Sequence, residues 1–147
     1  MTLVLDTNVL VSGLLSPFGA PGEIVRLVTS AAVRLCYDAR ILGEYRQVLL
    51  RPAFPFGRPR IESLLDQIRA DGDLVVPHPL AAPLPDPDDE VFLAVALAGR
   101  AQCLVTGNIR HYPQDRRQGV HVVAPRQFLD LYRAVSPGAP PCRVHDE

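Results

Sequence analysis

The sequence has no lysine and no tryptophan, and all fifteen of its basic residues are arginine. Phosphoaspartate enzymes and receiver-like domains also place acids at strand ends, but they need a lysine beside the aspartate, so this absence argues against both classes. No G-x-G-x-x-G pattern follows the first strand-like run, which argues against dinucleotide binding. The net charge of −1 gives no overall basic surface, so any contact with nucleic acid must be local.

Cysteine is scarce, and the three residues are widely spaced with no C-x-x-C pair. This pattern favours a reducing environment over a disulfide framework. Cys36 and Cys103 lie within apolar runs, and we expect them to be buried thiols. No apolar run approaches the ~20 residues needed to span a membrane, and no basic leader precedes the first apolar run. We therefore expect a cytoplasmic protein with no membrane association.

The rest of the chain alternates short apolar runs with amphipathic segments, which predicts alternating strands and helices. The expected strands are 2–6, 34–37, 74–76, 103–106 and 120–123. The expected helices are 8–15, 21–31, 39–50, 59–70, 88–100 and 125–134. This order predicts an α/β fold, a three-layer α/β/α sandwich around a parallel sheet of about five strands. We expect one domain over residues 1–135 and a flexible C-terminal tail over 136–147.

Side chains with oxygen ligands follow the predicted strands at one end. Asp6 comes directly after the first strand, and Glu44 lies in the second turn of the helix after the second strand. Asp86 and Asp89 begin the helix after the third strand, and Asn108 follows the fourth. Parallel strands place these positions at the same sheet edge, where clustered carboxylates repel unless a cation intervenes. An all-oxygen set favours Mg²⁺ or Mn²⁺ over zinc, and phosphodiester hydrolysis is the natural reaction class.

Each of these acids also has an ordinary structural explanation. Asp6 is of a type that often begins turns. Asp86, followed by Pro87 and by an acid at Asp89, matches a helix capping box. Glu44 shares the apolar face of its helix, where it is unfavourable unless a metal or an arginine pairs with it. The residues alone leave these alternatives open.

Four short motifs carry a resemblance to a known family. They are Leu5–Leu10, Ile41–Tyr45, Asp86–Ala94 and Leu104–Asn108. In this order and spacing they resemble the PIN domain family, the Rossmann-like metal-dependent ribonucleases that include the VapC-type toxins of toxin–antitoxin pairs. The resemblance covers residues 2–133, which is nearly the whole chain.

The resemblance implies that Asp6, Glu44 and Asp89 are the catalytic, metal-binding acids. It also implies supporting roles for a second group of polar residues. These are Asp86 and Asn108 as further metal ligands, and Asn8 and Thr106 as residues that line the site. Asn108 departs from the family pattern, which more often has a fourth aspartate there. Asparagine offers a carbonyl oxygen without charge, so we expect one metal, or a second ion that arrives with the RNA phosphate.

The residues and the resemblance together predict a Mg²⁺- or Mn²⁺-dependent endoribonuclease that hydrolyses RNA phosphodiester bonds. The resemblance further implies the toxin of a toxin–antitoxin pair, which would bind an antitoxin protein and form a homodimer. A loop beside the predicted site offers an RNA-binding path. Its residues are Arg110, His111, Arg116 and Arg117. Tyr112 and Phe56 are candidates for stacking on bases. The alternative is a PIN-like module with weak or no activity that binds RNA or a protein partner, and Asn108 keeps this alternative open.

Overall fold

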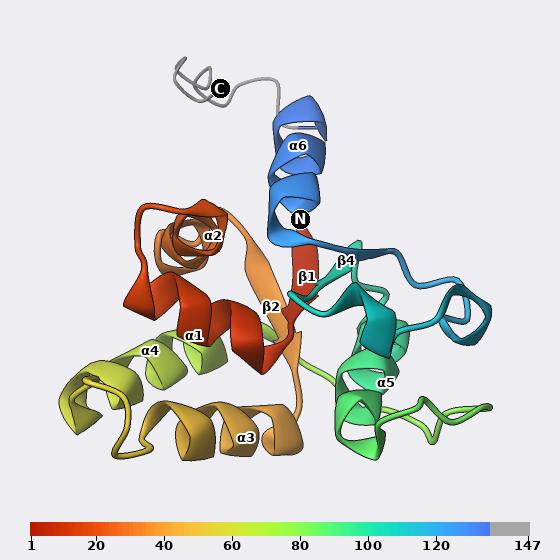
Figure 1. Ribbon diagram of the computed structural model, residues 1–147, viewed down its shortest axis with the longest axis horizontal. Coiled ribbons are helices and arrows are strands. Elements are labelled where there is room, and N and C mark those ends of the chain that lie inside the picture. Colours follow the sequence, from red (N-terminus) through yellow and green to blue (C-terminus); the bar gives the residue numbers. More distant parts are fainter. Residues whose placement is uncertain (136–147) are drawn as a thin grey trace.

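A five-stranded parallel sheet forms the centre of the structure (Figure 1). Its strands are β1 (Thr2–Leu5), β2 (Arg34–Tyr37), β3 (Asp73–Leu74), β4 (Cys103–Val105) and β5 (Val122–Val123). The order β3-β2-β1-β4-β5 places the first strand in the middle. Leu3 of β1 aligns with Leu35 of β2 and with Cys103 of β4. The predicted five-stranded parallel sheet is confirmed.

Helices cover both faces of this sheet in the computed structural model, which describes residues 1–135. They are α1 (Thr7–Leu15), α2 (Ala20–Thr29), α3 (Ala39–Leu49), α4 (Arg58–Asp71), α5 (Glu90–Gly99) and α6 (Pro125–Val135). Helices α1 to α4 lie to the left of the sheet in Figure 1, and α5 lies to the right, where it contacts β1, β2 and β4. The predicted three-layer α/β sandwich is confirmed. The predicted flexible tail, 136–147, lies outside the described residues.

The edge strands are shorter than their apolar runs predict. The third strand ends at Leu74 rather than at Val76. Val76 is 83% exposed, and the next residue is Pro77. The fifth strand begins at Val122 rather than at Val120. An apolar run indicates a strand, but the length of the strand depends on how many of its residues pair with an adjacent strand. An edge strand has an adjacent strand on one side alone.

The middle of the sheet is fully enclosed. The residues of β4 and the last three residues of β1 are buried, as are the free thiols Cys36 and Cys103. Continuous apolar runs are typical of parallel strands that are covered on both faces. The prediction of two buried thiols is confirmed. Along residues 1–135, no helix combines the length and apolar character needed to cross a membrane.

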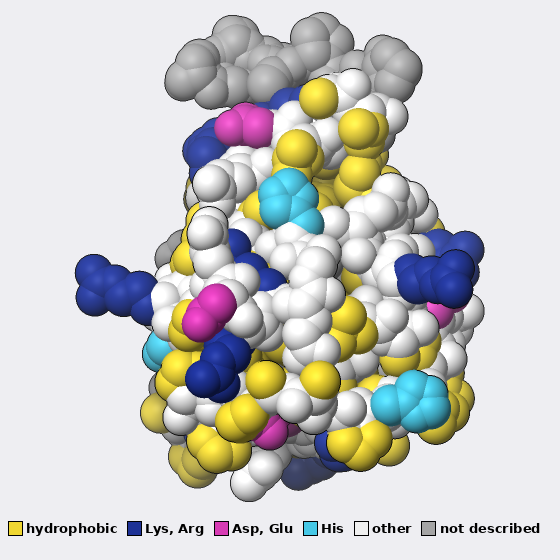
Figure 2. Space-filling model, turned by 90° about the vertical axis from the view of Figure 1, so that its right-hand side faces the viewer, with side chains coloured by type: hydrophobic (Ala, Val, Ile, Leu, Met, Phe, Trp, Pro, Cys, Tyr) yellow, Lys and Arg dark blue, Asp and Glu magenta, His cyan; other side chains and the backbone are white. Residues whose placement is uncertain are grey.

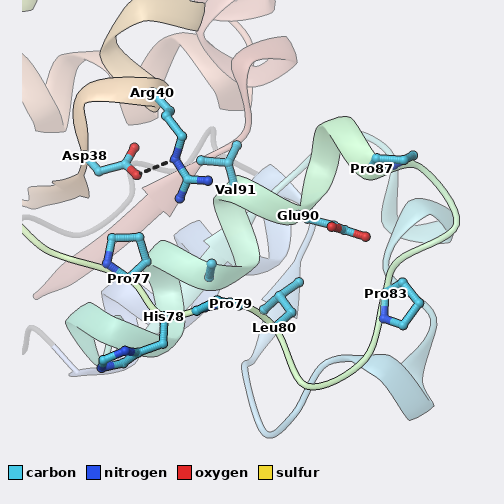
Figure 3. Close-up of a pocket in the computed structure, with 11 residues that line it drawn as sticks. Asp38, Arg40, Pro77, His78, Pro79, Leu80, Pro83, Pro87, Glu90 and Val91 are labelled. Carbon is cyan, nitrogen blue, oxygen red and sulfur yellow. Dashed lines mark hydrogen bonds and ion pairs between the residues drawn. The ribbon is translucent and has the colours of Figure 1, made fainter.

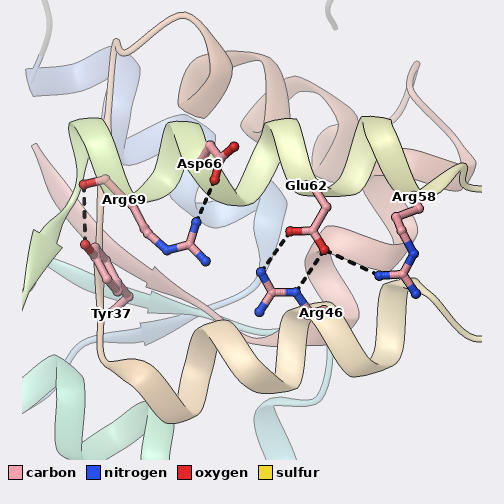
Figure 4. Close-up of polar contacts among 6 residues, drawn as sticks. All are labelled: Tyr37, Arg46, Arg58, Glu62, Asp66 and Arg69. Carbon is pink, nitrogen blue, oxygen red and sulfur yellow. Dashed lines mark hydrogen bonds and ion pairs between the residues drawn. The ribbon is translucent and has the colours of Figure 1, made fainter.

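Polar contacts fix α3 against α4 (Figure 4). Arg46 on α3 donates two hydrogen bonds to Glu62 on α4, at 2.8 and 3.0 Å, and Arg58 lies 3.6 Å from the same carboxylate. Partly exposed ion pairs contribute little stability one at a time, but a bidentate arginine adds geometric specificity. Because Glu44 lies half a turn before Arg46, these contacts fix the helix that carries Glu44.

Helices α1 and α2 approach each other closely at Gly13. A Cβ atom on Gly13 would lie 2.6 Å from Val25 Cγ2 and 2.7 Å from the carbonyl oxygen of Pro21. The carbonyl oxygen belongs to the backbone of α2, so it moves only if the helix moves. A side chain at this crossing would therefore displace α1, whose N-cap residue is Asp6.

We expect Gly13→Ala to lower the free energy of unfolding by about 2 kcal/mol, because an added methyl group overpacks this crossing. The matched control is Gly43→Ala in α3, whose Cβ would meet nothing within 4 Å. Alanine is the better helix former, so this control should raise the free energy of unfolding by about 0.5–1 kcal/mol. Urea unfolding of the two variants measures both effects, and a tolerated Gly13→Ala would contradict the close approach.

Candidate active site

The carboxylate of Asp6 is buried at the carboxyl end of β1. Its Oδ2 accepts hydrogen bonds from Thr106 Oγ1 at 2.9 Å and from the Tyr112 hydroxyl at 3.1 Å. Asp6 occupies the N-cap position of α1, but its side chain makes no capping hydrogen bond. The backbone N–H groups of Thr7 and Asn8, at the start of α1, also act on its carboxylate. Burial raises the pKa of Asp6, and the two hydroxyl donors partly offset this effect.

The loop after β4 is tied to Asp6 and to α1. Thr106 is fully buried, and its hydroxyl both donates to Asp6 and accepts the backbone N–H of Asn108 at 3.0 Å. On the other side, Asn8 Oδ1 accepts the backbone N–H of Gly107 at 3.0 Å. These contacts bring the predicted lining residues Asn8 and Thr106, and the backbone of Asn108, beside the first carboxylate.

Glu44 reaches the same sheet edge from α3. Its Oε2 accepts a hydrogen bond from Thr7 Oγ1 at 2.5 Å, and Thr7 directly follows Asp6 in the chain. None of the ion pairs in the described part of the chain includes Glu44, so the arginine partner considered as an alternative is not found there. The half-buried carboxylate is held by a neutral hydroxyl group instead.

Asp89 ends the 3₁₀ turn η1 (Pro87–Asp89) that precedes α5, and Asp86 is the N-cap of this turn. Asp86 Oδ1 accepts the backbone N–H of Asp88 at 2.9 Å, which confirms the predicted capping role of Asp86. Asp89 is 8% exposed, and its Oδ2 is the one buried side-chain oxygen or nitrogen without a hydrogen-bond partner among the described residues. His111 Nδ1 lies 3.0 Å from this oxygen, at ion-pair distance but without hydrogen-bond geometry.

The charge of Asp89 is therefore poorly compensated. Burial and then the negative charge of Asp6 raise the pKa of Asp89 to about 6, with His111 opposing the shift. Carboxylates that share a site without a cation behave in this way. Capping accounts for the position of Asp86, but it does not account for a buried acid at Asp89.

Tyr112 is a site residue that the sequence analysis misjudged. Its side chain is fully buried, so the prediction that it stacks on bases is wrong, and its hydroxyl donates to Asp6 instead. After burial, the charges of Asp6, Asp89 and Glu44 all raise its pKa, so each of the three predicted acids acts on this hydroxyl. No spacing in the sequence marks Tyr112, because the fold alone brings it to Asp6. Phe56 is also buried, in a stacked contact with a neighbouring phenylalanine.

One set of three ligand atoms lies close enough to chelate an ion. Among residues 1–135, one carboxylate oxygen from each of Asp86 and Asp89 and one ring nitrogen of His111 lie within 4.8 Å of one another. The Asp6 and Glu44 carboxylates, in contrast, are engaged by hydroxyl groups. The site thus has one half that is already hydrogen-bonded and one half with an unpartnered buried oxygen. These donors fit a divalent cation, which would compensate that oxygen.

A family model described as a PIN domain matches residues 2–110. This chain belongs to the PIN domain family. No curated protein and no solved structure matches it significantly. The matched segment of the PIN domain contains every predicted acidic site residue and Asn108, and it ends directly before His111.

The predicted arginines of this PIN domain differ in their surroundings. Arg116 Nη1 donates to the carbonyl oxygen of Pro83 at 2.6 Å, and Arg117 Nε donates to that of Tyr112 at 2.7 Å, so both hold the loops together. Arg110 is exposed. Figure 2 shows arginine and histidine side chains scattered among hydrophobic ones, with no continuous basic band over the described residues of that face. RNA binding by this loop stays a prediction.

A cleft of about 690 Å³ lies beside the start of α5 in the PIN domain (Figure 3). Pro87 and Glu90, which lie on either side of the Asp89 turn, form part of its wall. Arg40, at the start of α3, lines the cleft with its side chain 62% exposed and bonds to Asp38 at 2.9 Å. The sequence does not mark Arg40, because nothing in the chain order places it in a cleft with Pro87 and Glu90.

The raised pKa of Asp89 makes the stability of the metal-free domain depend on pH. Its folded-state pKa of about 6 exceeds the ordinary value of 3.8. The stability that protonated Asp89 contributes to the fold is therefore fully present below pH 3.8 and is lost as the pH rises through about 6. We expect Asp89→Asn to raise the free energy of unfolding in EDTA at neutral pH by about 1 kcal/mol, after allowance for solvent screening. This gain in the free energy of unfolding should disappear below pH 3.8, the ordinary pKa of the aspartate side chain.

Thermal unfolding across this pH range measures the effect. Asp88→Asn is the matched control, because Asp88 is an exposed acid in the same turn, and it should show a smaller change. Equal stability of Asp89→Asn and the unmodified domain at neutral pH would contradict the uncompensated charge.

Proposed function

We propose that this PIN domain is a divalent-metal-dependent endoribonuclease. PIN domains are generally nucleases. The observation that carries the proposal is the buried Asp89 oxygen without a hydrogen bond, beside Asp86 and close enough to Asp6 for the Asp6 charge to raise its pKa. Folding alone does not require acids to be gathered in this way, because each raises the free energy of ionising the next. A bound cation reverses the effect, and this donor set suits Mg²⁺ or Mn²⁺.

In this proposal Asp6, Glu44 and Asp89 hold the metal, with help from Asp86 and Asn108. When bound, a divalent cation neutralises phosphate charge and lowers the pKa of a coordinated water. The chain's own part is to orient the ligands beforehand. Hydroxyl groups already fix Asp6 and Glu44, and ligands held in place before binding lose little further conformational freedom.

The proposed substrate is single-stranded RNA that passes along the cleft beside α5. The cleft adjoins the Asp89 turn, and Arg40 offers it an exposed guanidinium group. Arginine suits phosphate because its planar donors contact two oxygens together. A smaller opening, lined in part by Asn8, Ser12 and Asn108, offers further polar groups.

We also propose that the domain acts as the toxin of a toxin–antitoxin pair in the cytoplasm, as the VapC-type resemblance implies. An antitoxin protein would cover the carboxylates, and the toxin would form a homodimer. Leu15, at the end of α1, is 47% exposed, and Phe18, in the turn that follows, is 95% exposed. Such apolar side chains are available for a protein contact.

Cleavage of a labelled single-stranded RNA tests the enzyme activity. We expect cutting with Mn²⁺ or Mg²⁺ and none with EDTA. Asp6→Asn should reduce the rate at least a hundredfold, in keeping with the ~10–100-fold losses seen for residues that merely support a metal ligand. Asparagine keeps the shape of the side chain and still accepts hydrogen bonds from Thr106 and Tyr112, so the fold should survive. The Asn108→Asp variant should cut RNA faster, because its new carboxylate adds the negative charge that Asn108 lacks.

Circular dichroism and thermal unfolding of Asp6→Asn confirm that a loss of activity is not a loss of fold. Activity that survives in Asp6→Asn would show that the assignment of the site is wrong. No cutting with either metal, together with tight binding of RNA or a protein partner, would favour the inactive binding module.

The role of Arg40 is tested by Arg40→Ala, which we expect to raise KM for RNA about tenfold with little change in kcat. One lost phosphate contact of a charge-assisted kind corresponds to about 1.5 kcal/mol. The KM of the variant should also depend less steeply on salt. Arg69→Ala is the matched control, because Arg69 pairs with Asp66 on the surface of α4. Equal effects of the two variants on KM would show that RNA does not pass along the cleft.

A further inference from the structure

His111 lies opposite the Asp89 oxygen, the one buried side-chain oxygen or nitrogen within residues 1–135 that lacks a hydrogen bond. Its Nδ1 is 3.0 Å from Asp89 Oδ2, and it joins Asp86 and Asp89 in a group of ligand atoms within 4.8 Å of one another. The histidine follows Asn108 on η2 (Ile109–His111), the 3₁₀ turn for which Asn108 is the N-cap. The loop that lacks an acid at Asn108 therefore supplies a nitrogen donor three residues later.

The distance between the two atoms has a direct meaning for metal binding. Neighbouring ligands of an octahedral ion with bonds of ~2.1 Å lie ~3 Å apart. The Asp89 oxygen and the His111 nitrogen have this separation without an ion, although they do not form a regular hydrogen bond. The separation of the pair therefore fits two bonds to one cation, and it also fits an ion pair between the two side chains.

We propose that His111 is a metal ligand, and that its Nδ1 with the carboxylates of Asp86 and Asp89 forms a mixed nitrogen–oxygen site that prefers Mn²⁺ to Mg²⁺. Imidazole nitrogen suits transition metals, whereas Mg²⁺ takes oxygen ligands. A neutral imidazole also adds a strong donor where Asn108 adds no charge. This inference rests on the proposed metal site at this sheet edge, but not on RNA as the substrate.

A role for His111 other than metal binding predicts a different effect on metal affinity. If His111 were just the cationic partner of Asp89, or a contact for RNA phosphate, its positive charge would oppose a metal ion at Asp89. Removal of the side chain would then tighten metal binding or leave it unchanged. The direction of the change in metal affinity thus separates a ligand from an ion-pair partner.

The experiment measures Mn²⁺ and Mg²⁺ binding to the full-length protein by calorimetry, and records pulsed EPR spectra of the Mn²⁺-loaded protein. We expect nitrogen coupling to Mn²⁺ in the unmodified protein. His111→Ala should abolish this coupling, weaken Mn²⁺ binding at least about tenfold, and weaken Mg²⁺ binding less. The matched control is His121→Ala, because His121 is an exposed histidine near β5, and it should retain the coupling and the affinity.

Spectra of the unmodified protein test the proposal even if His111→Ala fails to fold. Bound Mn²⁺ without nitrogen coupling, or with coupling that survives in His111→Ala, would overturn it, and so would tighter Mn²⁺ binding by that variant. If the coupling depends on His111 but no RNA is cut, His111 remains a ligand and the proposed nuclease activity fails. If RNA is cut while His111→Ala binds Mn²⁺ normally, the nuclease stands and this inference fails. A protein that binds neither metal overturns both.

Discussion

The parallel pairing of β1 with β2 and β4 is the constraint on which the rest of this structure depends. It brings the ends of three strands to one edge, so that Asp6, the helix that carries Glu44 and the loop from Thr106 onward meet there. The same burial that stabilises the middle strands also surrounds the first carboxylate. A buried acid next to other acids then requires donors or a cation. Hydroxyl donors meet this requirement at Asp6 and Glu44, whereas Asp89 keeps an oxygen without a hydrogen bond.

The two halves differ in how their charge is compensated. Asp6 and Glu44 are held by hydroxyl groups of Thr106, Tyr112 and Thr7, which orient the oxygens without neutralising them. Asp89 has an oxygen with no hydrogen bond and a raised pKa. Such an arrangement is unfavourable for folding alone and favourable for binding a cation, which is why the proposed function rests on Asp89 more than on the family resemblance.

Several candidate site residues could be predicted from the sequence because strand ends are local features. A short apolar run followed by Asp6, and an acid-rich turn before the helix at Glu90, locate the edge of a parallel sheet without any knowledge of contacts. Tyr112 could not be found in this way. Its hydroxyl meets Asp6 across more than a hundred residues of chain, and an aromatic residue in a loop gives no sign of which atom it will contact.

The sequence by itself determined the alternation of strands and helices, the parallel sheet and the set of acids at its edge, because each follows from residue type and periodicity over a few neighbours. Only the tertiary structure decided which acid is left without a partner and which histidine faces it. Burial, charge compensation and the separation of Asp89 from His111 depend on atoms brought together from different strands and loops. Pairwise geometry of this kind is set by packing, and no pattern of spacing along the chain contains it.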